Sequence, residues 1–222
     1  NQSYVKGMST IKAVADDRSP EETRVNPIPT WIIHDSTGYF FPEGGKWKQD
    51  DRPVEGSWHQ VALRYPDDRT KAPIFNLWLE HGNRPQNQSY TYIVAPNAGT
   101  ARMEEWASRL PFVIVNLEER QEVVTTDGMM AGIVFYQPGS STAFGGVETD
   151  QPCMVLLKKQ DGKLQVSIAD PTQVLKEVKL TLNGAYTGEN ALSANGKTMI
   201  RFPLPEGGMA GKTLTVHLKS AE

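Results

Sequence analysis

The segment PIFNLWLEHGNRPQNQSYTYIVAP, from Pro73 to Pro96, alternates apolar and polar residues on both sides of a polar centre. The apolar side chains that share a face are Phe75, Leu77 and Leu79 before the centre and Tyr90, Tyr92 and Val94 after it. Alternation with a period of two is typical of β-strands. The centre, His81 to Asn87, contains the Gly, Pro and Asn residues that a chain reversal needs. The segment therefore predicts a long antiparallel hairpin, around which we expect the rest of the chain to be organised.

Composition limits the size of the core and the range of partners. With 222 residues, 38% of them hydrophobic, the chain can bury one large core or two modest ones, and we expect two packed units. The single cysteine, Cys153, adjoins the apolar run 154–157 and is predicted to be a small buried hydrophobe without an internal disulfide. A net charge of −3 provides no general basic field, so we expect no nucleic-acid partner.

The hydropathy and the first residues of the chain bear on membrane-spanning and leader segments. No apolar run approaches the ~20 residues of a membrane-spanning helix, so no membrane partner is expected. Asn1 opens neither a basic nor an apolar leader segment. A start at Asn-Gln-Ser without Met indicates a chain that begins inside something larger or after processing, although an artificial boundary would look the same.

The first half of the chain reads mainly as short strands. Strand candidates are 3–14, Thr30 to Asp35, Tyr39 to Phe41 after a turn at Ser36 to Gly38, and Gly56 to Leu63. The best helical window is Gly99 to Leu110, followed by Pro111. One face of that helix would carry Met103, Trp106, Ala107 and Leu110. We interpret the helix as a connector between two units.

The second half reads as a series of strands. The apolar or alternating runs are 112–115, 133–136, 154–157, 164–168, 178–182, 199–204 and 214–218. Regular spacing of such runs between Gly, Asp and Pro signals indicates an antiparallel β-sandwich. The predicted fold is all-β with one short connecting helix, divided into residues 1–110 and 111–222.

Chemical motifs are sparse. The four histidines, His34, His59, His81 and His217, are scattered singly without the spacing of metal ligands, so no metal or cofactor is expected. His34 and Asp35 could form half of an acid–base pair, but the end of a strand leading into a turn is the better interpretation. The Gly-rich run 140–146 lacks the Lys of a phosphate loop and is interpreted as a turn.

Aromatic residues offer the best binding hypothesis. Among the five tryptophans, Trp47 lies between Lys46 and Lys48 and close to Arg52. An exposed indole beside cations could stack on a sugar ring and attract its acidic group. We therefore take Trp47, Lys46, Lys48 and Arg52 as candidate substrate-binding residues for an acidic polysaccharide, whereas the other tryptophans are expected in the core.

Several motifs resemble the β-domains of polysaccharide lyase family 8, which includes the chondroitin, hyaluronate and xanthan lyases. The motifs similar to the central domain are WIIHDSTGYFFP at 31–42, GSW at 56–58, LWLEHG at 77–82 with Pro85, and SYTYIVAPN at 89–97. Those similar to the small C-terminal domain are DQP at 150–152 and ADPTQ at 169–173. The amino-acid sequences of the central motifs resemble those of the broad-specificity chondroitin lyases.

This resemblance implies the end of a β-supersandwich followed by a C-terminal β-sandwich, in a parent whose N-terminal toroid and earlier central domain are missing here. Family catalysis is β-elimination by residues of the toroid, with a supporting Glu early in the central domain. No stretch matches either, so no catalytic residue is assigned; His34 and Tyr39 lie in a scaffold motif. The resemblance implies a non-catalytic, structural part of a secreted or periplasmic glycosaminoglycan lyase, inactive alone. A self-sufficient carbohydrate-binding module is the alternative.

Overall fold

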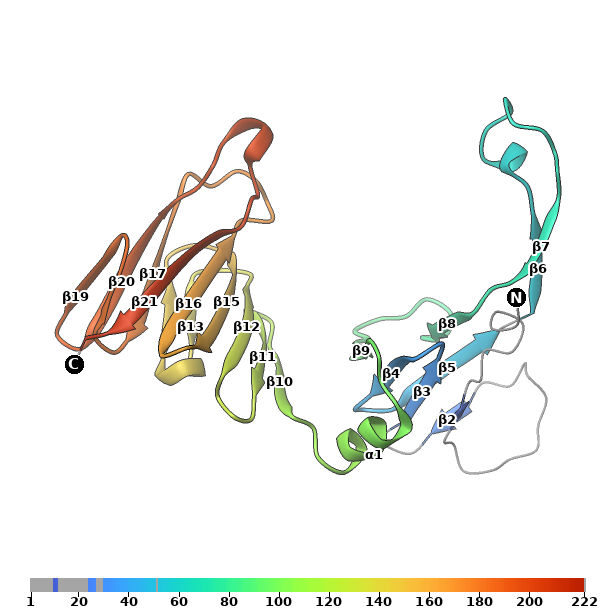
Figure 1. The fold of residues 1–222 in the computed structure, drawn as a ribbon, viewed down its shortest axis with the longest axis horizontal. Coiled ribbons are helices and arrows are strands. Elements are labelled where there is room, and N and C mark those ends of the chain that lie inside the picture. The colour runs from blue at the N-terminus through green and yellow to red at the C-terminus, as the bar shows by residue number, and fades with distance from the viewer. Residues whose placement is uncertain (1–9, 12–23, 27–29, 51, 222) are drawn as a thin grey trace. The chain divides into compact units, whose positions relative to one another are not determined.

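The computed structural model describes residues 10–11, 24–26, 30–50 and 52–221, and the chain separates into two compact units, 1–110 and 111–222 (Figure 1). The first unit contains a four-stranded antiparallel sheet in the order β1-β3-β4-β9. Its strands are β1 (Thr10–Ile11), β3 (Thr30–His34), β4 (Thr37–Phe41) and β9 (Ile93–Ala95).

A second sheet of the first unit has the order β2-β5-β8, with strands β2 (Arg24–Asn26), β5 (Gly45–Asp50) and β8 (Asn76–Leu79). A separate two-stranded ribbon joins β6 (Pro53–Gly56) to β7 (Thr70–Pro73). Between these two strands the chain forms a 3-10 helix, Trp58–Gln60. The helix α1 (Thr100–Ser108) follows β9.

Strand β4 is buried on both faces because its side chains alternate between two apolar clusters. Phe40 packs with Trp31 and Met103 in a cluster that α1 completes, whereas Phe41 packs with Trp47 of β5 in the other. Thus α1 covers one face of the four-stranded sheet and the sheet containing β5 covers the other. The predicted helix is confirmed, with Met103 fully buried.

Close packing of α1 depends on Gly38 in β4. A Cβ atom at Gly38 would lie 2.7 Å from the Sδ atom of Met103 and 3.1 Å from the Cβ atom of Ala98. Both distances are below those of ordinary contacts, so a larger residue would push α1 away from the sheet. The glycine is therefore required by the close approach of the helix.

The predicted hairpin of Pro73 to Pro96 is wrong. The first alternating run forms β8, whereas only Ile93–Ala95 of the second run forms a strand, β9, and Tyr90 and Tyr92 lie outside it. The two strands do not pair with each other, because β8 pairs with β5 and β9 pairs with β4, in different sheets. Leu79 is opposite Trp47, and Val94 is opposite Tyr39. Alternation identifies β8 and part of the second strand, but it carries no information about which strand is the neighbour.

Two local predictions are also corrected. The turn expected at Ser36 to Gly38 occurs earlier, because Asp35 and Ser36 have φ values of 45° and 63° and β4 already starts at Thr37. The strand expected over Gly56 to Leu63 is instead the end of β6 followed by the 3-10 helix. Of the strand expected over 3–14, only β1 lies within the described residues.

The second unit is an antiparallel sandwich of a seven-stranded and a five-stranded sheet. The first sheet, in the order β10-β11-β12-β15-β16-β21-β18, contains β10 (Phe112–Asn116), β11 (Arg120–Thr125), β12 (Met130–Phe135), β15 (Cys153–Gln160), β16 (Lys163–Ala169), β21 (Leu214–Ser220) and β18 (Tyr186–Thr187). The second, in the order β13-β14-β17-β20-β19, contains β13 (Gly139–Ser141), β14 (Val147–Thr149), β17 (Glu177–Asn183), β20 (Lys197–Pro203) and β19 (Ala191–Ala194).

One apolar core fills this sandwich, and alternate residues of the strands supply it. In β17, Val178, Leu180 and Leu182 are buried while the residues between them are half-buried. Cys153 is buried in the same core, as predicted, and desolvation raises the pKa of its thiol to about 11. The predicted all-β fold with a sandwich after a short helix is confirmed. No helix in the described ranges is long and apolar enough to cross a membrane.

Candidate functional site

An apolar opening on the first unit is lined by strands of both its four-stranded and its three-stranded sheet. It has a volume of about 450 Å³. The strands contribute Tyr39, Phe41, Leu77, Trp78, Leu79 and Val94, and the segment between β8 and β9 contributes His81, Tyr90 and Tyr92. We call this opening the aromatic groove, because six of these nine residues carry an aromatic ring.

The rim of the aromatic groove is formed by stacked rings. Tyr90 and Tyr92 have ring centroids 6.1 Å apart and planes 25° from parallel, and the ring centroid of His81 lies 5.5 Å from that of Tyr90. Tyr90 and Tyr92 are 59% and 52% exposed. Such rings can cover apolar surface while their hydroxyl and ring-nitrogen groups meet water or a polar partner. The nine lining residues include no Lys, Arg, Asn or Gln, so they offer no permanent cation and no amide to a carboxylate.

The interpretation of Trp47 as an exposed platform is wrong. Trp47 is only 2% exposed and its indole stacks on Phe41, with centroids 6.3 Å apart and planes 8° from parallel. Successive side chains of a strand point to opposite faces, so Trp47 in β5 enters the core while its neighbours Lys46 and Lys48 point the other way. Trp47 and the two lysines are adjacent in sequence, but their side chains lie on opposite faces of the strand.

The cations of the predicted cluster are divided between different contacts. Lys48 forms an ion pair with Glu80 in which the Nζ and Oε1 atoms are 2.8 Å apart. Lys48 is also opposite Trp78 of β8, whose side chain is 44% exposed. Lys46 is exposed. Trp78, rather than Trp47, is therefore the aromatic residue on the lysine face of this sheet. Alternation in β8 separates Trp78 from Leu77 and Leu79, but only the pairing of β8 with β5 places it beside the lysines.

Arg52, the fourth predicted residue, binds the carboxylate of Asp50. Its Nε and Nη2 atoms donate to the two carboxylate oxygens at 2.9 and 2.8 Å, and its backbone N–H donates at 3.0 Å. These hydrogen bonds and the guanidinium charge hold the pKa of Asp50 at about 2. This bidentate contact lies at the end of β5, and it pairs the positive charge of Arg52 with a carboxylate of the same chain.

Two of the histidines predicted to be scattered singly, His34 and His59, have local partners. His34 stacks on Phe75 at 4.1 Å with planes 9° apart, and its Nδ1 atom is 3.7 Å from the Asp35 carboxylate, too long for a hydrogen bond. His59 donates from Nδ1 to the Tyr65 carbonyl oxygen at 2.7 Å. Across the described part of the chain, no three His, Cys, Asp or Glu residues form a group that could hold a metal ion.

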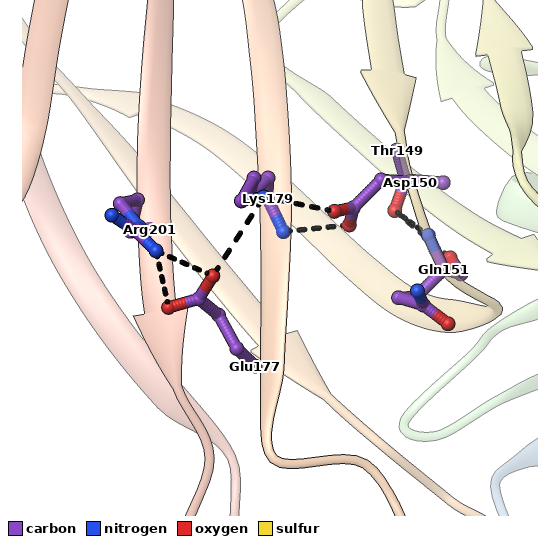
Figure 2. Close-up of polar contacts among 6 residues, drawn as sticks. All are labelled: Thr149, Asp150, Gln151, Glu177, Lys179 and Arg201. Atoms are coloured by element: carbon purple, nitrogen blue, oxygen red, sulfur yellow. Dashed lines mark hydrogen bonds and ion pairs between the residues drawn. The ribbon is translucent and has the colours of Figure 1, made fainter.

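A charged network lies across the five-stranded sheet of the second unit, as Figure 2 shows. Arg201 of β20 donates to both oxygens of Glu177 at 2.9 and 3.1 Å, and Lys179 lies between Glu177 and Asp150. The backbone N–H of Lys179 donates to Asp150 at 2.8 Å. The turn after β14 is closed by the Thr149 hydroxyl, which donates to the Gln151 carbonyl.

This network has a structural explanation. The hydrogen bond of Arg201 holds the pKa of Glu177 below its usual value, so the pair stays charged to lower pH than an isolated glutamate would. The Asp150 carboxylate accepts a hydrogen bond from β17 and so links the end of β14 to that strand. The Asp-Gln-Pro motif therefore has a structural role at this strand end. The charges balance one another, leaving no excess of one sign for a charged ligand.

The second motif of this unit, Asp170 to Gln173, organises the loop between β16 and β17. The Asp170 carboxylate is buried and accepts four hydrogen bonds, two from Thr172 and one each from the backbone N–H groups of Val174 and Leu175. Burial alone would raise the pKa of Asp170, but these hydrogen bonds outweigh it and lower the pKa. The role of Asp170 is visible only once the loop is folded around it.

Comparison with known proteins connects both units to one family. Residues 1–107 match the family model described as "Polysaccharide lyase family 8, super-sandwich domain". Residues 113–179 match a second model, described as "Polysaccharide lyase family 8, C-terminal beta-sandwich domain". The chain belongs to polysaccharide lyase family 8. The two motif-rich regions identified from the sequence therefore correspond to consecutive domains of family 8.

Relatives of this family 8 chain are longer than the chain itself. The chain is 31% identical over 216 residues to a chondroitinase-AC from Pedobacter heparinus, a match that covers 96% of this chain and 30% of that protein. It is 30% identical over 148 residues to a hyaluronate lyase from Thermasporomyces composti, covering 66% of this chain and 19% of that protein. The chain therefore spans less than a third of these curated relatives.

Solved structures give the same picture. A chondroitinase AC lyase determined in complex with oligosaccharides matches 92% of the family 8 chain with a TM-score of 0.68 and 28% identity, over 30% of its own length. A Paenibacillus xanthan lyase matches 100% of the chain with a TM-score of 0.78, over 23% of its own length. At 21% identity the xanthan lyase supports the fold alone.

Proposed function

We propose that this chain is the non-catalytic β-portion of a bacterial, secreted or periplasmic lyase that cleaves a chondroitin-type acidic polysaccharide by β-elimination. The observation that carries this proposal is the 31% identity to chondroitinase-AC over 96% of the chain. Only 30% of that relative is matched, so the parent protein has room for a catalytic domain elsewhere.

The described side chains support a structural role. β-Elimination next to a carboxylate needs a base at the C5 proton, a group that neutralises the carboxylate and an acid for the leaving oxygen. In the aromatic groove, His81 and Tyr90 could supply a base and an acid, but the lining includes no cation or amide for the carboxylate. Without that group the C5 proton stays too weakly acidic for removal, so the groove lacks one of the three functions.

The aromatic groove is better suited to packing than to chemistry. Its floor is formed by Phe41, Leu77 and Leu79, which belong to the same apolar cluster as Trp47. An opening that continues directly into the core between two sheets is typical of a surface that other strands cover. We therefore assign the first unit the task of supporting neighbouring parts of the lyase.

A carbohydrate-binding module is the second candidate, because Trp78 is exposed on the same sheet face as Lys46 and Lys48. An indole flanked by lysines could bind an acidic sugar even in the absence of catalysis. In that case chondroitin sulfate would bind the isolated chain, more weakly as salt rises, and Trp78→Ala would abolish the binding while an exposed tyrosine control, Tyr136→Ala, would not.

The test of the favoured proposal is the absorbance of unsaturated uronate after incubation of the chain with chondroitin sulfate, hyaluronan or xanthan. We expect no product from the chain by itself. Turnover that survives repurification and disappears in His81→Ala or Tyr90→Phe would show that the aromatic groove is an active site. Turnover lost in His34→Ala or Tyr39→Phe would place the site at the scaffold motif instead.

A further inference from the structure

The β6–β7 ribbon forms an arm, defined here as residues 53–73, that shares no strand with either sheet of the first unit (Figure 1). Its register runs from Pro53 opposite Pro73 to Gly56 opposite Thr70. All side chains of β7 are exposed, and those of β6 are exposed up to Gly56. A two-stranded ribbon without a packed face is at best marginally stable in water. The arm therefore lacks a covering partner within the described residues.

The end of the arm carries its most exposed apolar side chains. Trp58, Val61 and Leu63 are 72%, 76% and 83% exposed, and we call these three residues the apolar tip. Single exposed apolar residues are common, but three large ones within six positions of a protruding segment indicate an interaction site.

Hydrogen bonds within the arm hold the apolar tip in place. The Ser57 hydroxyl donates to the Asp67 carboxylate at 2.5 Å, and His59 donates to the Tyr65 carbonyl oxygen. The ring of Trp58 lies 6.3 Å from that of Tyr65. These contacts fix the shape of the tip without an apolar core, so the tip is presented in a defined conformation, which lowers the entropic cost of binding.

Charge and chemistry indicate the kind of partner. The arm carries as many acidic as basic residues, namely Glu55, Asp67 and Asp68 against Arg64, Arg69 and Lys71. Arg69 donates to Glu55 at 3.3 Å, so part of this charge is paired internally. A balanced arm does not attract a polyanion, and the aliphatic side chains of Val61 and Leu63 cannot hydrogen-bond sugar hydroxyls. An uncharged, apolar protein surface fits the tip best.

We propose that the apolar tip docks on an apolar protein surface in the part of the full-length lyase that lies outside this chain. The inference rests on the proposed function. The match to xanthan lyase spans the whole chain, arm included, within a protein of which it makes up 23%. The arm thus belongs to a fold that recurs within much longer chains, where further polypeptide is at hand to cover Trp58, Val61 and Leu63.

Limited proteolysis tests this docking at Arg64, which is exposed between Leu63 and Tyr65. Trypsin is added to the 222-residue chain and to the full-length lyase that contains it, and cleavage after Arg64 is timed by mass spectrometry. Docking should slow this cleavage by at least about tenfold in the full-length lyase, because cleavage follows the population of the open arm.

Variants separate docking from other causes of protection. In the full-length lyase, the triple change Trp58→Ser, Val61→Ser and Leu63→Ser should restore rapid cleavage. A matched triple change of exposed apolar residues in the second unit, Val174→Ser, Leu192→Ser and Met209→Ser, should leave the arm protected.

Three results would overturn the inference. Equal cleavage rates in the chain and the full-length lyase would show that nothing covers the tip. Protection that appears in the chain alone at rising concentration would assign the tip to a second copy, and protection on adding chondroitin oligosaccharides would assign it to sugar. Because the readout is cleavage, docking can fail while lyase activity of the full-length protein persists, whereas absent lyase activity would refute the proposed function instead.

Discussion

Replacement of Asp170 gives the clearest prediction about stability. Asp170 is 2% exposed, and its four hydrogen bonds range from 2.6 to 2.9 Å. A hydrogen bond to a charged group contributes about 1.5–3 kcal/mol, and the cost of removal is reduced where the donors regain water. Since Thr172 and Val174 are exposed, we expect Asp170→Ala to destabilise the second unit by about 3–4 kcal/mol rather than by the full sum.

Asp170→Asn separates charge from shape. The amide keeps an acceptor for the two bonds from Thr172 but points an N–H₂ group at the backbone N–H groups of Val174 and Leu175. We expect a loss of about 2–3 kcal/mol, below that of Asp170→Ala. The exposed Glu189→Gln is a matched control and should change stability by less than about 0.5 kcal/mol.

The pH dependence follows from the lowered pKa of Asp170. A carboxyl whose pKa is lower in the folded than in the unfolded state contributes its full stabilisation above the ordinary value of 3.8 and loses it as pH falls through the folded pKa. The free-energy difference between the chain and Asp170→Asn should therefore be constant from pH 7 to about 5 and shrink below 3.8.

Hydrogen exchange read by mass spectrometry on peptides from β16 and β17 measures this difference in the second unit. Tryptophan fluorescence would not, because the five tryptophans all lie in the first unit. A cost for Asp170→Asn below about 0.5 kcal/mol at pH 7, or a cost that is the same at pH 3, would refute this account of the loop.

The first unit and the buried thiol give further predictions. Gly38→Ala should cost about 1–3 kcal/mol by forcing Met103 of α1 outward, as measured by urea unfolding with tryptophan fluorescence; an unchanged midpoint would contradict the close approach. In the same assay Trp47→Ala should cost about 3–5 kcal/mol and the exposed Trp78→Ala about 0.5 kcal/mol or less, and equal losses would contradict the assigned strand faces. Cys153, whose pKa burial raises to about 11, should react with a thiol reagent at pH 8 only after unfolding; rapid labelling of the folded chain would show that the core is open.

The sequence predicts where the strands and the helix lie better than it predicts which strands pair. Alternation located β8 and β9, and the period of α1 identified Met103 as a core residue. Pairing depends on contacts between distant residues, such as Leu79 with Trp47, and a local pattern cannot contain them. The tip of the arm looked like a strand because its apolar residues were assumed to face a core, whereas they are exposed.

The candidate binding cluster failed for a related reason. Trp47 and its flanking lysines are adjacent in sequence, but adjacent residues of a strand occupy opposite faces. The lysine face receives Trp78 from β8 instead, which requires knowing that β5 and β8 pair. The aromatic groove was missed altogether, because its residues come from two sheets and the segment between them.

The most direct test of the account is the lyase activity of a chimera. In this chimera the chain replaces the matched region of the Pedobacter heparinus chondroitinase-AC, with that enzyme lacking the region as the reference. The account predicts that the chimera releases unsaturated uronate from chondroitin sulfate, whereas the truncated enzyme and the chain alone do not. Product from the chain alone, or a folded chimera without activity, would contradict the claim that this chain supports a catalytic domain outside itself.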